Sequence, residues 1–276
     1  MLLRDPVPSI ASRRARALLV LLGAPVFLAA CAGAPPPLPG SLIEGAGFMH
    51  RIDVQGRLDG ADRVHVYLEG DGRPFATRHL PAGDPTPRRR LARELMALDP
   101  APSIYLARPC YEGLAQAPGC APRLWTEARY GTEVVASLAA ALARLRVTHR
   151  IGHYTLVGYS GGGVLAMLLA ERIEAVDRVI TVAANLDLEA WAAAHGYSPL
   201  TASLDPARRP PLPPRVAQVH YAGGRDRNVP PAQISAALRA QTGARLVIVD
   251  DAAHARGWIT VWPLLLAAQV SGSVLR

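Results

Sequence analysis

The sequence predicts one α/β domain whose mostly parallel, doubly wound β-sheet carries helices on both faces. Two observations predict this class. Short apolar runs rich in β-branched residues alternate with segments of helical periodicity from about residue 48 onward. The chain has 276 residues and is 50% apolar, which is enough for one sizeable core and excludes a disordered protein. Such alternation favours a parallel sheet, because each parallel pair needs a crossover that is usually a helix.

The runs predicted to be strands are bounded by Gly, Pro or Asp and cover residues 63–68, 103–107, 154–158, 178–183, 216–221 and 245–249. The predicted helices between them cover residues 87–98, 132–145, 162–173, 231–242 and 259–270. The first helix is predicted to begin at Pro87 with Thr86 as its N-cap, because proline suits the first helical position. Residues 47–55 and the chain from Gly56 onward are expected to add an antiparallel hairpin at one edge.

Residues 186–214 interrupt this rhythm. The segment follows a predicted strand but contains Trp191 and Tyr197 and ends in the proline-rich run 209–214. We expect it to form a small lid or cap, and the alternative is a surface connection with one short helix. Residues 46–276 otherwise form one predicted domain.

The amino terminus has the features of an export signal. Residues 1–16 are basic, and the apolar run at 17–30 is shorter than the roughly 20 residues that a bilayer-spanning helix needs. Residues 1–30 are therefore predicted to be a signal peptide. The run ends in Leu28-Ala29-Ala30-Cys31, which resembles the lipobox of bacterial lipoproteins.

That resemblance implies that the signal is cut before Cys31 and that this cysteine is lipidated. Residues 31–45 are rich in proline and are expected to form an extended tether behind the lipid anchor. Ala32 follows the cysteine, which by analogy with enteric lipoproteins implies sorting to the outer membrane. The expected location is the bacterial cell envelope, with the domain held at a membrane and facing the periplasm.

Export to an oxidising compartment also predicts how the other cysteines are used. With Cys31 assigned to lipid, Cys110 and Cys120 remain as an even pair. The alternative to a disulfide is two buried, unpaired thiols. We predict the disulfide, which would stabilise the fold by about 3 kcal/mol according to the chain-entropy model.

All 30 basic residues are arginine, which excludes mechanisms that need a lysine, such as Schiff-base chemistry and the Walker P-loop. Residues 1–30 contribute +3 to the net charge of +8 and leave +5 on the rest. These arginines are scattered apart from residues 88–90 and 208–209, and no nucleic-acid-binding motif accompanies them. We expect solvated side chains and no nucleic-acid partner, with weak attraction to anionic lipid headgroups as the alternative.

The pentapeptide Gly158-Tyr159-Ser160-Gly161-Gly162 carries the strongest chemical signal. A predicted strand precedes it and a predicted helix follows it directly. This arrangement is typical of a nucleophile elbow, in which a serine on a tight turn needs small residues two positions before and after it. The helix amino terminus then offers N–H groups to a developing oxyanion. Ser160 is the candidate nucleophile, and the alternative is a glycine-rich turn with an incidental serine.

A serine nucleophile needs a base, and the base needs an acid to orient it. His254 is the candidate base because its loop, between the last predicted strand and helix, can bring the ring to the carboxyl edge of the sheet. Asp226 is the candidate acid because it closely follows the strand at 216–221, and Asp187 after the preceding strand is the alternative. The sequence contains no H-E-x-x-H motif, so we predict no metal site.

The elbow, the G-x-x-D-x-x-V-P turn at residues 223–230 and the late histidine resemble the α/β-hydrolase superfamily, over about residues 60–276. The order Ser160, Asp226, His254 is the order of the superfamily. The resemblance implies the α/β-hydrolase fold with Ser160 as nucleophile, His254 as general base and then acid, and Asp226 as the orienting carboxylate. It implies no cofactor.

The same resemblance implies an oxyanion hole formed by the N–H of Gly161 and, from the loop Glu69-Gly70-Asp71-Gly72, the N–H of Asp71. Many members carry a His-Gly pair where this chain has Glu69-Gly70, and a plain Asp-Gly turn is the alternative. The Glu-Gly-Asp-Gly sequence, Arg108-Pro109-Cys110 and the stretch from Trp125 to Tyr130 are also similar to a group of uncharacterised bacterial secreted or lipoprotein α/β-hydrolases.

The predicted function is that of a membrane-anchored serine hydrolase that cleaves a small-molecule or lipid ester through an acyl-enzyme on Ser160. Esters are favoured over thioesters and amides because the superfamily is rich in esterases, which is an analogy of fold. The alternative function is that of a catalytically inactive envelope lipoprotein that serves as a binding or assembly scaffold.

Overall fold

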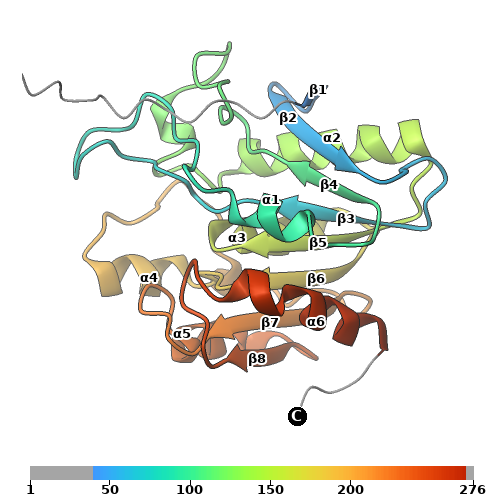
Figure 1. Cartoon of the computed structure of the whole chain (residues 1–276). Coiled ribbons are helices and arrows are strands. Elements are labelled where there is room, and N and C mark those ends of the chain that lie inside the picture. The colour runs from blue at the N-terminus through green and yellow to red at the C-terminus, as the bar shows by residue number, and fades with distance from the viewer. Residues whose placement is uncertain (1–39, 272–276) are drawn as a thin grey trace, which may run out of the picture. The chain divides into compact units, whose positions relative to one another are not determined.

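The computed structural model of the chain describes residues 40–271, and Figure 1 shows how their helices and strands are arranged. The predicted signal peptide, Cys31 and most of the predicted tether lie outside the described residues. Lipidation and membrane anchoring therefore stay predictions from the sequence. Within residues 40–271, no helix combines the length and the apolar character that a membrane span needs.

An eight-stranded sheet has the order β1-β2-β4-β3-β5-β6-β7-β8. Its strands are β1 (Ser41–Glu44), β2 (Met49–Gln55), β3 (Arg63–Leu68), β4 (Ser103–Leu106), β5 (His153–Tyr159), β6 (Val176–Val182), β7 (Ala217–Gly223) and β8 (Arg245–Val249). β2 pairs antiparallel with both β1 and β4, whereas all pairs from β4 to β8 are parallel. The mostly parallel sheet predicted from the sequence is confirmed.

Two hydrophobic layers cover the sheet, one on each face. The helices are α1 (Leu91–Met96), α2 (Thr132–His149), α3 (Gly161–Arg172), α4 (Leu188–His195), α5 (Pro231–Ala237) and α6 (Trp258–Ser271), and the short 3-10 helices are η1 (Pro122–Leu124), η2 (Pro206–Arg208) and η3 (Leu238–Ala240). One layer contains residues of α2, α3 and α5, and the other contains residues of α1 and α6 (Figure 1). The predicted doubly wound arrangement is therefore present.

The alternation of side chains along each strand separates the two layers. In β3, Val64 and Val66 belong to the layer of α2 and α3, whereas Tyr67 belongs to the other layer, where its ring meets Trp262 edge-on. All four side chains are completely buried. Complete burial of one valine side chain contributes roughly 1.5–3 kcal/mol. Because both faces are buried, β3 carries apolar residues on each of them, although Arg63 and His65 remain polar positions within the strand.

The sequence predicted a hairpin at the edge of the sheet, but the predicted partner of the strand at residues 47–55 was wrong. β2 pairs with β1, which precedes it and lies within the segment 31–45 predicted to be a tether, and not with the chain after Gly56. A tight turn joins the two strands: the Gly45 N–H donates to the Phe48 carbonyl at 2.8 Å, and Gly47 has a left-handed φ of 79°. The four-residue β1 gives too short a pattern to be detected in the sequence.

The predicted start of the first helix was also wrong. α1 begins at Leu91 instead of Pro87. Thr86 does not cap it, because the Thr86 hydroxyl accepts a hydrogen bond from the Glu112 N–H at 2.7 Å. A contact with a distant loop thus overrides the local preference of the Thr-Pro pair. At the other end of the chain, α5 stops at Ala237 and continues as η3.

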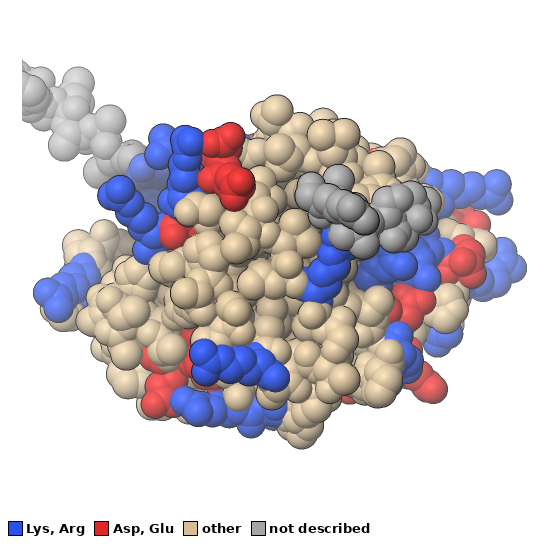
Figure 2. All heavy atoms as spheres, turned by 90° about the horizontal axis from the view of Figure 1, so that it is seen from below, with Lys and Arg blue, Asp and Glu red and all other residues tan. Residues whose placement is uncertain are grey.

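Many arginines pair with carboxylates on the surface. Such pairs include Arg63–Asp177, Arg89–Glu94, Arg123–Glu133, Arg208–Glu189 and Arg225–Asp251. Figure 2 shows one face of the molecule, on which arginine and acidic side chains are interspersed among uncharged residues. Each exposed pair contributes little to stability, but together the pairs neutralise much of the local positive charge.

β7 carries a fully buried histidine, His220, whose Nδ1 is 2.8 Å from the Thr181 Oγ1 on β6. Burial lowers the pKa of His220 to about 4, because the charged ring would lose its hydration. In the unfolded chain the same ring takes up a proton near pH 6.5. As the pH falls from about 6.5 to 4, the unfolded state binds this proton and the folded state does not, so stability is lost.

We expect His220→Asn to reduce the acid sensitivity of the fold. Protonation of His220 in the unfolded state should lower the free energy of unfolding of the wild-type protein by about 2 kcal/mol between pH 7 and pH 5. The variant lacks this contribution and should lose correspondingly less stability. Denaturant titrations at the two pH values measure the difference. The exposed His79 supplies a control, since His79→Asn should retain the wild-type loss. Equal losses in His220→Asn and wild type would contradict the prediction.

Candidate active site

Ser160 lies on the turn between β5 and α3, with φ 49° and ψ −123°. This backbone conformation is strained for a residue with a side chain, at a cost of about 1–3 kcal/mol. The Ser160 N–H donates to the Val182 carbonyl of β6 at 2.8 Å and so holds the turn in place. A Cβ on Gly158 would overlap the Gly162 carbonyl, and one on Gly162 would overlap the Leu68 carbonyl. These contacts explain why both positions are glycine.

His254 and Asp226 meet Ser160 at the carboxyl edge of the sheet. The Ser160 Oγ is 3.1 Å from the His254 Nε2, and the His254 Nδ1 is 2.8 Å from the Asp226 Oδ2. Asp226 lies in the loop after β7, and His254 lies between β8 and α6. Because parallel strands end at one edge, these loops bring three distant parts of the sequence together.

The hydrogen bonds of Asp226 determine which nitrogen of His254 carries the proton. Asp226 is buried, and its Oδ1 accepts the N–H groups of Asn228 at 2.8 Å and Val229 at 2.9 Å. An ionised carboxylate only accepts hydrogen bonds, so the His254 Nδ1–H donates to Oδ2. The lone pair of Nε2 then faces the Ser160 hydroxyl, which is the orientation that a general base needs.

The loop that carries His254 is fixed from two sides. The fully buried Trp258 at the start of α6 donates from its Nε1 to the carbonyls of Ala253 at 2.8 Å and His254 at 3.1 Å. Arg89 donates from Nη1 to the Ala255 carbonyl at 2.7 Å. The backbone on both sides of the imidazole is therefore held in position.

Asp187, the alternative acid, does not join this group. It is the N-cap of α4, and its Oδ1 accepts the Ala190 N–H at 2.9 Å. The His254 Nδ1 is bonded to Asp226 instead.

The loop at residues 69–72 lies against the elbow. A Cβ on Gly70 would be 3.4 Å from the Ser160 Cβ, and a Cβ on Gly161 would overlap the Asp71 carboxylate. Within residues 40–271, the N–H groups of Asp71 and Gly161 have no acceptor. Two unsatisfied donors beside a serine can bind an oxyanion.

The Asp71 side chain has partners that the sequence analysis missed. Its carboxylate lies 2.8 Å from the Arg108 Nη2 and 2.9 Å from the Arg129 Nη1, and it accepts the Tyr130 hydroxyl at 2.5 Å. The Tyr111 hydroxyl donates to the Asp71 carbonyl at 3.0 Å. Burial alone would raise the pKa of Asp71, but the two guanidinium groups hold it below its ordinary value. The loop is thus fixed through an ionised side chain.

Both arginines of this cluster are buried, with exposed fractions of 3% for Arg108 and 5% for Arg129. Arg108 also lies over the rings of Tyr111 and Tyr130, at 5.7 and 5.2 Å from their centroids. A buried arginine needs a buried carboxylate, but nothing in the sequence indicates which arginines are buried. The only available signal was the resemblance to the uncharacterised hydrolases, which covers these same segments.

Glu69, which stands where many α/β-hydrolases have histidine, connects this loop to α1. Its Oε1 accepts the Gly70 N–H at 3.1 Å, and its Oε2 accepts the Ala92 N–H at 3.0 Å. Burial raises the pKa of Glu69 to about 8, although these backbone donors oppose the shift. The departure from the His-Gly pattern therefore places a buried carboxyl group, and not an imidazole, behind the loop.

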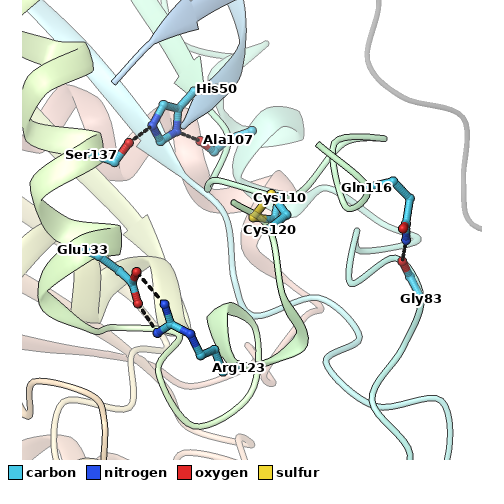
Figure 3. The surroundings of a disulfide bond; sticks show 9 residues. All are labelled: His50, Gly83, Ala107, Cys110, Gln116, Cys120, Arg123, Glu133 and Ser137. Atoms are coloured by element: carbon cyan, nitrogen blue, oxygen red, sulfur yellow. Dashed lines mark hydrogen bonds and ion pairs between the residues drawn. A yellow bond between two sulfur atoms is a disulfide. The ribbon is translucent and has the colours of Figure 1, made fainter. Parts of the chain in front are cut away.

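The predicted disulfide between Cys110 and Cys120 is present, with the two Cα atoms 5.5 Å apart (Figure 3). It closes the loop between the segment that carries Arg108 and the segment that leads to Arg129. The disulfide therefore links covalently the two segments that supply Arg108 and Arg129 to the Asp71 carboxylate. Such a cross-link lowers the entropy of the unfolded chain and so favours the arrangement seen here.

A second serine–histidine pair lies beside this loop and has a different character. The His50 Nε2 is 2.7 Å from the Ser137 Oγ on α2, and its Nδ1 is 2.9 Å from the Ala107 carbonyl (Figure 3). His50 and Ser137 are completely buried, and burial lowers the pKa of His50 to about 4. Because both nitrogens of the His50 ring have uncharged partners, this pair fastens α2 to the sheet.

The part of the chain that the structure describes holds no group of three or more His, Cys, Asp or Glu side chains that could bind a metal ion. The arrangement around Ser160 instead joins a serine, a histidine and a buried carboxylate by hydrogen bonds, beside two N–H groups without an acceptor.

No protein-family model matches the sequence, and no curated protein is significantly similar to it. Solved structures do match. An esterase from Pyrococcus furiosus has a TM-score of 0.61 at 12% identity, covering 86% of this chain and 94% of its own. An α/β serine hydrolase homologue from Coxiella burnetii has a TM-score of 0.56 at 15% identity, covering 88% of this chain and 100% of its own.

A lidless α/β serine hydrolase from Xanthomonas campestris is also similar, with a TM-score of 0.54 at 13% identity, and covers 88% of this chain and 100% of its own. At such low sequence identities, the similarity shows only that these proteins share a fold with this chain. The predicted α/β-hydrolase fold is thereby confirmed.

We expect Asp71→Asn to destabilise the protein strongly, because two buried guanidinium groups would lose their counter-charge. Removal of one partner from a buried ion pair costs about 3–5 kcal/mol, which a denaturant titration measures as free energy of unfolding. Glu189→Gln removes a carboxylate that pairs with Arg208 in solvent, and should cost less than about 1 kcal/mol. Similar losses in the two variants would contradict this interpretation of the cluster.

Proposed function

We propose that this α/β-hydrolase-fold protein is a serine hydrolase that cleaves an ester through an acyl-enzyme on Ser160. The observation that carries the proposal is the unbroken series of hydrogen bonds from the Ser160 Oγ through the two nitrogens of His254 to the Asp226 carboxylate. The similar structures that are called serine hydrolases and esterases support the same class of reaction.

In the first half of the reaction, the Ser160 oxygen attacks the ester carbonyl carbon while its proton passes to the His254 Nε2. The Asp226 carboxylate stabilises the imidazolium that forms. The N–H groups of Gly161 and Asp71 bind the negative oxygen of the tetrahedral intermediate. His254 then gives its proton to the leaving alkoxide, the C–O bond breaks, and the acyl group remains on Ser160.

In the second half, a water molecule takes the place of the alcohol. His254 accepts a proton from the water as its oxygen attacks the acyl carbonyl, and the same N–H groups bind the new oxyanion. The proton returns to the Ser160 oxygen as the ester bond to the serine breaks. The carboxylic acid leaves, and the enzyme is restored.

The ionised side chain of Asp71 lies near the place where negative charge develops, and alone it would oppose catalysis. Arg108 and Arg129 reverse this effect, because two cations and one anion leave the cluster with an excess positive charge. In a largely buried site such charges interact more strongly than in water. The cluster can therefore hold the loop and also favour the oxyanion.

The alternative function, an inactive scaffold, has one observation in its favour, which is Glu69 in place of the histidine that many members carry. The free N–H of Asp71 argues against it, because the second donor does not depend on that side chain. The membrane anchor at Cys31 and the periplasmic location are proposals that rest on the N-terminal sequence alone. The hydrolase proposal does not require them.

The test is reaction with a fluorophosphonate probe, which labels activated serines. Wild-type protein should be labelled, and Ser160→Ala should not be labelled and should lose ester hydrolysis by about 10⁴-fold or more. Ser137→Ala is a matched control, because Ser137 also faces a histidine but is completely buried, and it should label like wild type. Absence of labelling in folded wild-type protein would favour the scaffold.

A second prediction concerns Asp226→Asn. The backbone N–H groups of Asn228 and Val229 would hold the oxygen of the new amide, so its NH2 would face the His254 Nδ1. The ring would then carry its proton on Nε2 and could not accept one from the serine. We expect kcat to fall by about 10⁴-fold with little change in stability.

Steady-state kinetics with an activated ester measure this effect. Asp187→Asn is the control, because Asp187 caps α4, and it should retain most of the wild-type kcat. A loss in Asp187→Asn as large as that in Asp226→Asn would disprove the assignment of the acid.

A further inference from the structure

Asn228 connects the proposed triad of Ser160, His254 and Asp226 to helix α4, which lies within the segment 186–214. Its N–H donates to the Asp226 Oδ1 at 2.8 Å, and its Nδ2 is 3.0 Å from the His254 Nε2. On the other side, its carbonyl is 2.8 Å from the His195 Nε2, and its Oδ1 accepts the Trp191 indole N–H at 3.3 Å. Two partners belong to the triad and two belong to α4.

The partners determine how the Asn228 amide is oriented. The indole N–H of Trp191 can only donate, so the amide must turn its oxygen toward the indole and its NH2 toward His254. Since the Nδ1 of His254 donates to Asp226, its Nε2 carries the lone pair. The Asn228 NH2 therefore donates to the same lone pair that faces the Ser160 Oγ at 3.1 Å.

Two donors thus share one acceptor, and this has a consequence for proton transfer. In the resting site, the amide N–H stabilises the neutral ring. When the proton of Ser160 reaches Nε2, the new N–H would face the N–H of Asn228, and two donors repel each other. Proton transfer is easier if Asn228 moves away or turns its Oδ1 toward the ring, but the hydrogen bond from Trp191 opposes that turn.

We propose that Asn228 is a positioning residue that restrains His254 in its resting state, and that α4 sets this restraint through Trp191. The inference rests on the proposed function, since it concerns the same base. The Trp191 ring packs against the rings of His195 and Tyr197 at 5.4 and 5.3 Å. Tyr197 is 56% exposed, so one ring of this aromatic cluster is open to solvent.

The test compares the covalent labelling kinetics of two variants with those of wild type, using a fluorophosphonate at a range of concentrations. Asn228→Ala removes the competing donor, and Trp191→Phe keeps an aromatic ring but removes the indole N–H. At saturating probe, we expect each to label about three- to tenfold faster than wild type, the size expected for the loss of one competing hydrogen bond. The probe concentration that gives half the maximal rate should not change.

The double variant shows whether the two residues act together. If Trp191 acts through Asn228, the double variant should be no faster than Asn228→Ala alone. Additive effects would overturn the part of the proposal that concerns α4. Trp125→Phe is the matched control: it also removes an indole N–H, which donates to the Ala82 carbonyl at 3.1 Å and not to Asn228, and it should label at the wild-type rate.

The outcomes separate this proposal from the proposed function. If folded wild-type protein is not labelled, the hydrolase proposal itself fails. If wild type is labelled through Ser160 but Asn228→Ala is no faster or is slower, only the inference about Asn228 is overturned. A merely structural role predicts slower labelling, because a loosened site positions His254 less well. A faster rate is therefore a result that simple loss of structure does not produce.

Discussion

The buried carboxylate of Asp226 is the contact on which one half of the site depends. One oxygen accepts two backbone N–H groups of its own loop, and the other accepts the His254 Nδ1–H. These bonds set the shape of the loop after β7 and the proton position on the ring. They also fix the backbone of Asn228, whose side chain reaches the other nitrogen of the same ring. A single ionised group thus orients both edges of the imidazole.

Asp71 has the corresponding place on the opposite side of Ser160. There the carboxylate is bound by side chains instead of backbone groups, and its partners come from the segments that the disulfide joins. The elbow lies between these two carboxylates. Each holds in place a loop that lies beside Ser160 or His254. The site therefore depends on buried charge at both ends, with strained backbone at its centre.

Much of this could be predicted from the sequence because the signals are local. The strand before Ser160 and the helix after it both have a local sequence pattern, and Gly158 and Gly162 stand at positions where any side chain would collide with a carbonyl group. Asp226 and His254 follow strands that parallel pairing brings to one edge. For these residues, order along the chain and position after a strand were sufficient to predict their meeting.

The rest depends on contacts between distant segments. Arg108 and Arg129 resemble any other arginines until the fold buries them with Asp71. Thr86 has the character of an N-cap, but it bonds to Glu112 in a loop far along the chain. The role of Asn228 follows from the packing of α4, which no pattern within residues 223–230 reveals. Such pairings are a property of the tertiary structure and leave little trace in local sequence.

The short antiparallel edge of the sheet has a mechanical consequence. A pulling force on the chain before Gly40 acts first on β1, whose register with β2 runs only from Ser41 opposite Ile52 to Glu44 opposite Met49. This ladder can open one pair at a time from its outer end. The parallel strands that lead into Ser160, Asp226 and His254 form separate ladders on the far side of β4. Tension is therefore relieved at the edge while the strands beneath the site stay paired.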